Sequence, residues 1–189
     1  MTRIYFVRHC KPDGKIKDDR NRPLTEEGLS DSSKVAEILK DKKIDVFISS
    51  PYKRSVDSIK KAAEFYAKSI ETDERLRERK GGKDWEGLLE KRWADLSFAE
   101  EEGESIGAVQ KRNVEALTEI LKKHKDKNIV IGTHGTALSS IINYFDKSFN
   151  YDSFMRIVKF MPWILKMEFD GETFLSKEDI FHIQKEYKE

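Results

Sequence analysis

Cysteine and long apolar runs are scarce in this sequence of 189 residues. A single cysteine excludes an internal disulfide bond and a cysteine-based zinc site, and such sparing use is typical of a reducing cytosol. The first apolar run is too short for a signal-peptide core, and charged residues interrupt every later run before it reaches the length of a membrane span. We therefore expect a cytoplasmic protein with no membrane partner.

Excess charge of either sign is also lacking, because 36 Lys and Arg against 35 Asp and Glu leave a net charge of +1. This balance gives no reason to expect nucleic-acid binding, so any cationic site must be local. Phosphate-binding Walker loops, glycine-rich dinucleotide motifs and the H-E-x-x-H zinc motif are absent. We expect a single domain over residues 1–189, with neither metal nor cofactor. The oligomeric state stays open because no apolar seam stands out.

The clearest feature that the sequence does have is a strand-like run, Ile4 to Val7, that ends at Arg8 and His9. Its apolar, β-branched and aromatic residues are typical of a strand buried on both faces of a parallel sheet. Ligands of open α/β sheets bind beyond the carboxyl ends of the strands. A guanidinium group binds phosphate or carboxylate oxygens, and a neutral imidazole can act as nucleophile or base. The pair suggests an anion held against a nucleophile, although Arg-His after a strand also occurs by chance.

The loop that follows is polar and marked by proline and glycine, and it carries Lys15, Arg20 and Arg22. These cations can reach a distal charge on a substrate, but solvated loop charges are the commoner alternative. Thr25 is a plausible N-cap for a helix that ends near Lys43. We expect Leu29 to lie on the inner face of that helix.

A second buried strand, 46–48, precedes Ser49-Ser50-Pro51 and a helix from Tyr52 to about Lys68, which places Arg54 in its first turn. A cation is locally unfavourable at the positive end of a helix. A bound anion would explain Arg54 at this position. A surface salt bridge is the alternative.

The later strands repeat this arrangement. A weaker strand over 70–73 leads to Glu78, and a strand over 128–132 runs into Thr133-His134-Gly135 and a helix. A lone histidine is more often structural, but the strand-turn-helix context shared with His9 favours a functional role for His134.

Other parts of the chain read less clearly. We expect the irregular segment at about 80–104 to cover the crevice, and Ser105 to cap an amphipathic helix. Residues 164–169 and 173–175 read as a hairpin at a sheet edge. The charged tail beyond Ser176 is expected to be frayed or loosely docked.

The motifs together resemble the histidine phosphatase superfamily, the phosphoglycerate-mutase-like proteins. They are Arg8-His9, Leu24-Thr-Glu-Glu-Gly28, Ser49-Ser50-Pro51 with Arg54, Leu76-Arg-Glu78, Gly103-Glu-Ser and Thr133-His134-Gly135. The resemblance covers residue 3 to about 145 and implies an α/β fold, a three-layer α/β/α sandwich with a mainly parallel sheet. It also implies that His9 is transiently phosphorylated, that Arg8, Arg54 and His134 hold the phosphoryl group, and that Glu78 is the proton donor.

Three departures from the family pattern bear on function. Cys10 replaces the usual glycine, where a small thiol can simply pack or, beside cations, become ionised and oxidisable. Lys15 lies near the place of an asparagine common in mutases. The spacing from Glu78 to Trp85-Glu-Gly is one residue longer than usual, so no role is carried over to Trp85 or Glu86. Glu86 and Glu104 are weaker candidates than Glu78 for the proton donor.

These features predict a metal-independent phosphatase that hydrolyses small phosphate monoesters through phospho-His9. The alternatives are a phosphoglycerate-type mutase and a non-catalytic module that binds a phosphate ligand or a phosphoprotein. The expected partner is a small phosphorylated substrate, whose identity lies beyond the sequence. Specificity is expected in the loop 11–22 and the segment 80–103, and Trp85, Trp93 and Trp163 are as suited to the core as to a pocket wall.

Overall fold

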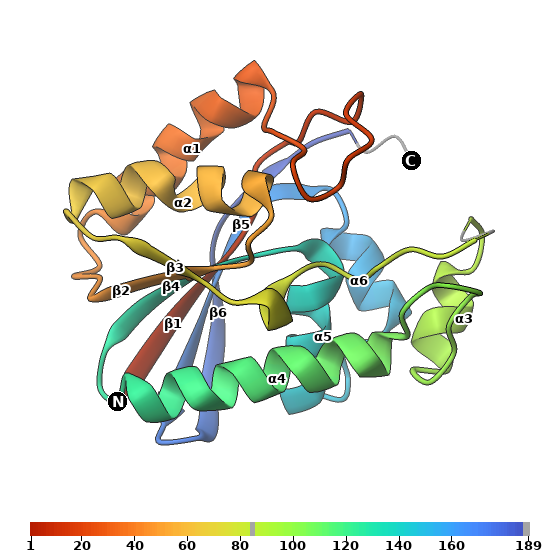
Figure 1. The fold of residues 1–189 in the computed structure, drawn as a ribbon. Helices are drawn as coiled ribbons and strands as arrows, with labels where there is room; N and C mark the ends of the chain where they lie inside the picture. The colour runs from red at the N-terminus through yellow and green to blue at the C-terminus, as the bar shows by residue number, and fades with distance from the viewer. Residues whose placement is uncertain (84–85, 187–189) are drawn as a thin grey trace.

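The strand predicted from Ile4 to Val7 lies within a six-stranded sheet of order β3-β2-β4-β1-β5-β6 (Figure 1). The computed structural model describes residues 1–83 and 86–186. Its strands are β1 (Thr2–Arg8), β2 (Val46–Ser49), β3 (Ile70–Thr72), β4 (Asn128–Thr133), β5 (Phe160–Asp170) and β6 (Thr173–Gln184). Its helices are α1 (Glu26–Leu39), α2 (Lys53–Phe65), α3 (Leu89–Ala94), α4 (Ile106–Lys123), α5 (Gly135–Phe145) and α6 (Tyr151–Ile157), with a 3₁₀ turn η1 (Glu74–Leu76).

Helices cover both faces of this sheet. Figure 1 shows α1 and α2 over one face and α4 and α5 over the other, with α3 and α6 toward one end. Strands β1 to β4 pair in parallel, whereas β5 and β6 form an antiparallel edge. The prediction of a three-layer α/β/α sandwich with a mainly parallel sheet is therefore confirmed.

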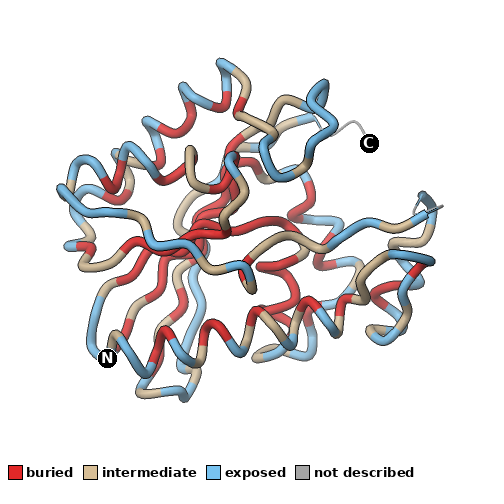
Figure 2. Tube along the Cα trace, in the orientation of Figure 1, coloured by how far each residue is buried: buried red, intermediate tan, exposed pale blue. Residues whose placement is uncertain are grey.

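The central strands bury side chains on both faces, as the apolar run predicted. Ile4 and Phe6 belong to the core under α4 and α5, while Tyr5 and Val7 belong to the core under α1 and α2. Successive side chains of a strand point to opposite faces, so a strand in the middle layer must be apolar at every position. The buried segments in Figure 2 trace these central strands.

Helix α1 begins as predicted but faces the sheet differently. The Thr25 side chain accepts a hydrogen bond from the Gly28 amide at 3.0 Å. A Cβ at Gly28 would lie 2.4 Å from the Lys11 carbonyl oxygen, so only glycine allows this approach. The approach fixes the rotation of α1, which turns Val35 inward and leaves Leu29 45% exposed. The expectation that Leu29 lies on the inner face was wrong.

The tail beyond Ser176 is not frayed. It continues as β6 along β5 to Gln184, and the His182 ring stacks on Phe160 with centroids 3.8 Å apart. Beyond the strand, the Lys185 ammonium group contacts the Asp31 carboxylate of α1 at 2.6 Å and also pairs with Glu27. Sequence reasoning missed this extension because the alternating charges of β6 serve a sheet edge with one face exposed to water.

None of the helices within residues 1–83 and 86–186 is long and apolar enough to cross a membrane.

The ion pair at the C-terminal end gives a first test. The Asp31 side chain is 3% exposed, so Lys185→Met leaves this carboxylate with the exposed Lys34 as its one remaining ion-pair partner among residues 1–83 and 86–186. We expect the free energy of unfolding to fall by about 2 kcal/mol. Lys177→Met, which removes an exposed pair with Asp146, should change it by less than about 1 kcal/mol. Urea unfolding of both variants measures the difference, and equal losses would contradict the assignment of Lys185 as an anchor.

Candidate active site

The carboxyl ends of β1, β2 and β4 meet at one edge of the sheet. Arg8 is in register with Thr133, and Ser49 is in register with Gly132. The ladder continues one residue further, because the His9 amide donates to the Thr133 carbonyl at 3.1 Å and the Ser50 amide to the Gly132 carbonyl at 3.0 Å. The strand pairing thus brings together two strand-end histidines far apart in sequence, His9 and His134, with ring centroids 5.3 Å apart.

One nitrogen of the His9 ring is hydrogen-bonded to the backbone, which fixes the orientation of the ring. Its Nδ1 lies 2.8 Å from the Cys10 carbonyl oxygen. A carbonyl only accepts, so Nδ1 carries the proton and Nε2 keeps its lone pair. Burial lowers the pKa of His9 well below its ordinary value, and the Arg54 and Arg8 guanidinium groups lower it further. The neutral tautomer has a nucleophilic nitrogen at Nε2.

The His134 ring is fixed by a residue that the sequence analysis had not assigned. Its Nε2 lies 2.7 Å from the Ser50 hydroxyl oxygen. That oxygen accepts a hydrogen bond from the Tyr52 amide at 3.3 Å. The Nδ1 atom is buried and has no hydrogen-bond partner within the described part of the chain. Burial, followed by Arg54 and His9, lowers the pKa of His134 well below its usual value. Ser50 had a recognisable signal, because it occupies the same strand-end position as His9.

Arg8 lies beneath the first turn of α5. Its Nη1 donates to the Ile157 carbonyl at 2.9 Å. A Cβ at Gly135 would come within 3.2 Å of the guanidinium carbon, so a larger residue there would displace Arg8 or the helix. The glycine after His134 therefore provides room for the cation at the positive end of α5.

Arg54 is 3% exposed in the first turn of α2. Its Nη1 lies 3.1 Å from an Asp19 carboxylate oxygen, and its guanidinium carbon lies 5.1 Å from the centre of the Tyr52 ring. The predicted salt bridge is therefore present, but its carboxylate comes from a loop and is itself half exposed. Such a pair leaves the buried cation able to exchange Asp19 for another anion.

The loop cations separate into two groups. Arg22 shares Asp19 with Arg54, at 3.3 Å, and contributes to the lowered pKa of His9. Arg20 instead pairs with Glu74 at the surface, and Lys15 is exposed. Of the predicted loop residues, Arg22 therefore lies beside Arg54. The Arg20 guanidinium carbon lies 6.0 Å from the centre of the Tyr52 ring, which packs against His134 with centroids 5.3 Å apart.

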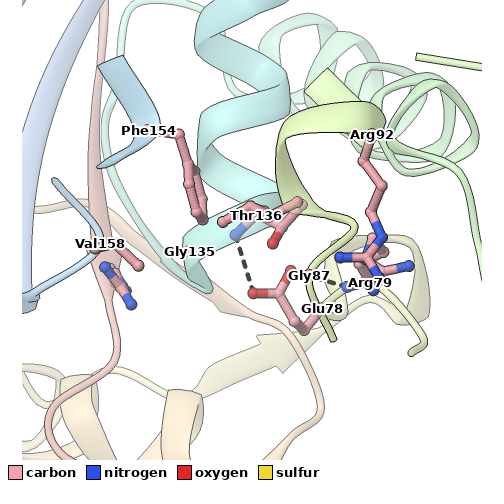
Figure 3. Close-up of a pocket in the computed structure, with 10 residues that line it drawn as sticks. Glu78, Arg79, Gly87, Arg92, Gly135, Thr136, Phe154 and Val158 are labelled. Carbon is pink, nitrogen blue, oxygen red and sulfur yellow. Dashed lines mark hydrogen bonds between the residues drawn. The ribbon is translucent and has the colours of Figure 1, made fainter. Parts of the chain in front are cut away.

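Glu78 lies beside Gly135 and Thr136 at the start of α5, the helix that follows His134 (Figure 3). Its Oε2 accepts from the Thr136 amide at 3.0 Å, and its Oε1 accepts from the amides of Ala137 at 3.0 Å and Arg79 at 2.8 Å. Two of these donors belong to the first turn of α5, where free amides favour an anion. Oε2 accepts one bond fewer than Oε1, so it retains capacity to exchange a proton.

A cavity of about 140 Å³ adjoins Arg8 and Glu78. Its lining also includes Arg79, Gly87, Leu89, Arg92, Gly135, Thr136, Phe154 and Val158. The wall is apolar at Leu89, Phe154 and Val158 and cationic at the three arginines. This mixture suits a small organic group attached to an anion.

The remaining candidates are less suited to proton transfer. Glu86 is exposed. Burial alone would raise the pKa of Glu104, but hydrogen bonds from Arg112 and Arg77 outweigh it and hold the pKa at about 2. A carboxyl group held so firmly as its anion is a poor proton donor near neutral pH.

Cys10, Trp93 and Trp163 are packed in the core. The thiol is fully buried, and burial raises its pKa to about 12, so it stays neutral in the core rather than ionising. Trp93 and Trp163 are 6% and 4% exposed and belong to the core under α4 and α5. Trp85 lies outside the described residues.

Known proteins resemble this chain in sequence and in fold. The sequence profile of the histidine phosphatase superfamily (branch 1) matches residues 4–175. A 2,3-bisphosphoglycerate-dependent phosphoglycerate mutase of Thermoplasma acidophilum is 30% identical over 77% of this chain and 76% of its own. A metal-independent phosphoserine phosphatase of Arabidopsis thaliana is 30% identical over 75% of this chain and 67% of its own. The solved structure of YhfR from Bacillus stearothermophilus has a TM-score of 0.75 and 26% identity, over 93% of this chain and 95% of that chain.

The buried histidines predict a pH-dependent stability. Folding keeps His9 and His134 neutral, whereas the unfolded chain protonates both below about pH 6.5. The unfolded state therefore binds more protons than the folded state below this pH. As the pH is lowered further, the free energy of unfolding should decrease by about 1.4 kcal/mol per pH unit for each histidine. Urea unfolding between about pH 5 and pH 7 measures this slope. His134→Asn should remove roughly half of the slope that the two buried histidines contribute. A slope unchanged in this variant would contradict the assignment of that pH dependence to His134.

Proposed function

The chain belongs to the histidine phosphatase superfamily, and on that premise we propose that it hydrolyses small phosphate monoesters through a phosphohistidine intermediate on His9, without a metal ion. The protonation state of the His9 ring is the observation that supports the proposal most directly. The ring is neutral, and its Nδ1 is committed to the Cys10 carbonyl. Nε2 is therefore available as the nucleophile that covalent phosphoryl transfer requires.

In the first step, the Nε2 lone pair of His9 attacks the phosphorus atom and the bond from phosphorus to the ester oxygen breaks. An alkoxide is a poor leaving group, so the departing oxygen takes a proton from the Glu78 carboxyl group. The products are phospho-His9 and an alcohol. The cavity beside Glu78 and Arg8 is where the alcohol portion would lie.

In the second step, water attacks the phosphorus atom and the bond to Nε2 breaks. The Glu78 carboxylate accepts the proton of that water, so the residue that was the acid now acts as the base. Inorganic phosphate leaves, and His9 returns to its neutral form with the proton still on Nδ1.

Charge on the transferred group is stabilised by the groups around His9. A phosphoryl group in transfer spreads negative charge over its equatorial oxygens, so fixed donors and cations lower the barrier. Arg8, Arg54 and the Nδ1–H of His134 are assigned to this role, with Ser50 donating to His134 Nε2 to leave that proton on Nδ1. Arg22 is retained as a substrate-binding residue, and it would share the anion with Arg54 once Asp19 is displaced.

Similarity to the Thermoplasma acidophilum mutase favours a second candidate. In a phosphoglycerate-type mutase, phospho-His9 would pass its phosphoryl group to a second hydroxyl of the substrate instead of to water. Exchange between 2- and 3-phosphoglycerate without release of phosphate would favour this candidate. A pure binding module would form no phosphohistidine at all.

The direct test measures phosphate release from p-nitrophenyl phosphate, O-phosphoserine and 3-phosphoglycerate in the presence of EDTA. We expect activity in the unmodified chain and a loss of at least about a thousandfold in His9→Ala, because the nucleophile is removed. His124→Ala, at the C-terminal end of α4, is the matched histidine control and should retain activity. Activity that requires a metal ion, or that persists in His9→Ala, would contradict the proposal.

A further inference from the structure

Arg112 of α4 divides its donors between the segment that carries Glu78 and the carboxylate of Glu104. Its Nη1 donates to the carbonyl oxygens of Arg75 at 2.6 Å and Arg77 at 2.7 Å. Its Nη2 donates to the Glu78 carbonyl at 3.0 Å and to Glu104 Oε2 at 2.9 Å, and its Nε donates to Glu104 Oε1 at 2.8 Å. A guanidinium group has five N–H donors in a rigid plane, so all five are engaged.

The carbonyls that Arg112 holds lie in the short 3₁₀ turn η1 and in the two residues just beyond Leu76. The last backbone bond to the neighbouring strand runs from the Asp73 amide to the Ser49 carbonyl. After this point the chain makes η1 and then an extended residue, Arg77. Beyond η1 neither a helix nor a sheet ladder fixes the chain, so the side chain of Arg112 supplies bonds that orient it.

Glu104 keeps Arg112 in place. It forms a two-pronged ion pair with Arg112 and also accepts from Arg77 at 2.9 Å. The Arg112 and Glu104 side chains are 13% and 14% exposed, so water screens the pair poorly. Paired bonds between planar groups fix the plane of the guanidinium as well as its position.

Glu78 is therefore held at both of its ends by different helices. Arg112 of α4 fixes its backbone, while the Thr136 and Ala137 amides of α5 bind its carboxylate. Arg112 itself does not line the cavity beside Glu78. Its direct hydrogen bond to that cavity's lining is the one to the Glu78 carbonyl, while its charge also contributes to the lowered pKa of His134.

We propose that Arg112 is a positioning residue for proton transfer, holding Glu78 where its carboxyl group meets the leaving oxygen of the substrate. The inference rests on the proposed phosphatase function. General acid catalysis demands a short distance to the oxygen that takes the proton, and small displacements of the acid lose rate steeply. A purely structural ion pair would stabilise the fold without favouring any class of ester.

The basicity of the leaving group separates these two roles. A p-nitrophenolate ion leaves readily without a proton, whereas phenolate and the serine alkoxide depend increasingly on an acid. We would measure kcat/KM for p-nitrophenyl phosphate, phenyl phosphate and O-phosphoserine, because this ratio reports the transfer to His9. The variants are Glu78→Gln, Arg112→Met, the double variant and Arg75→Met.

Arg75→Met is the matched control. The Arg75 side chain also joins η1 to α4, through Asp73 and Glu119, each at 2.7 Å. Its replacement keeps the backbone carbonyl that Arg112 binds. The loss of this ion pair should leave the relative kcat/KM values for the three esters unchanged.

We expect Glu78→Gln to reduce kcat/KM for phenyl phosphate and O-phosphoserine about 100-fold more than for p-nitrophenyl phosphate. Arg112→Met should reproduce this order with a selective loss of about tenfold or more. The double variant should lose no more on O-phosphoserine than Glu78→Gln does, because both changes act through one group.

Equal losses on all three esters in Arg112→Met, or a fully additive double variant, would overturn the positioning role and leave the phosphatase function intact. If the unmodified chain hydrolyses none of the esters, or His9→Ala retains activity, the function fails and the inference fails with it. Should Arg112→Met not fold, Arg112→Lys decides the question. It keeps the charge but offers only three donors without the planar fork, so the same selective loss is expected.

Discussion

The parallel pairing of β4 with both β1 and β2 is the constraint on which the rest of the structure depends. It aligns three strand ends at one edge and continues for one more residue, through the amides of His9 and Ser50. Backbone hydrogen bonds therefore fix the spacing of the histidine pair. The two helix N-termini that follow these ends, α2 and α5, add partial positive charge to the same place. A register shift in β4 would separate His134 from His9 and turn the apolar side chains of that strand toward the wrong layers.

The site keeps cations and neutral imidazoles together in a buried environment. Arg8 and Arg54 are 5% and 3% exposed and lie against histidines whose pKa values are lowered chiefly by burial. Burying cations without a compensating anion is unfavourable. Part of that compensation comes from Asp19 on a loop, which pairs with Arg54. A bound phosphate dianion would supply the rest, which is why this arrangement favours an anionic ligand over a neutral one.

Two helices on the same face of the sheet, α4 and α5, together hold Glu78 in place. Its carboxylate is bound by the start of α5 and its backbone by a side chain of α4, so the acidic group lies between two rigid elements. The proposed role of Glu78 in proton transfer requires placement within a fraction of an ångström, and loops by themselves do not provide this precision. Residues 77–78 lie beyond the short turn η1 in neither a helix nor a strand, and Arg112, which is paired with Glu104, supplies hydrogen bonds there.

The layered fold followed from the sequence, which also pointed to the candidate site residues. The continuous apolar run Ile4 to Val7 is typical of a strand with two buried faces, and strand-end histidines in the same context come together when neighbouring strands are parallel. These signals are local or periodic, so they can be read along the chain. Departures occurred where the pattern was weak. Leu29 lies outward because Gly28 sets the rotation of α1, and the charged tail is an edge strand because β5 offers it a partner.

Only the tertiary structure decided which partners complete the site. The carbonyl that fixes the His9 tautomer and the amides on Glu78 are backbone groups, which no residue pattern distinguishes, and the pairing of the Ser50 hydroxyl with His134 depends on the strand register. The course of a loop places Arg22 on Asp19 beside Arg54, and Arg20 on Glu74 and over the Tyr52 ring. Three of the five bonds of Arg112 reach residues 34 to 37 positions away from a helix whose sequence reads as merely amphipathic. Such contacts are set by distances in the folded chain, which local sequence does not encode.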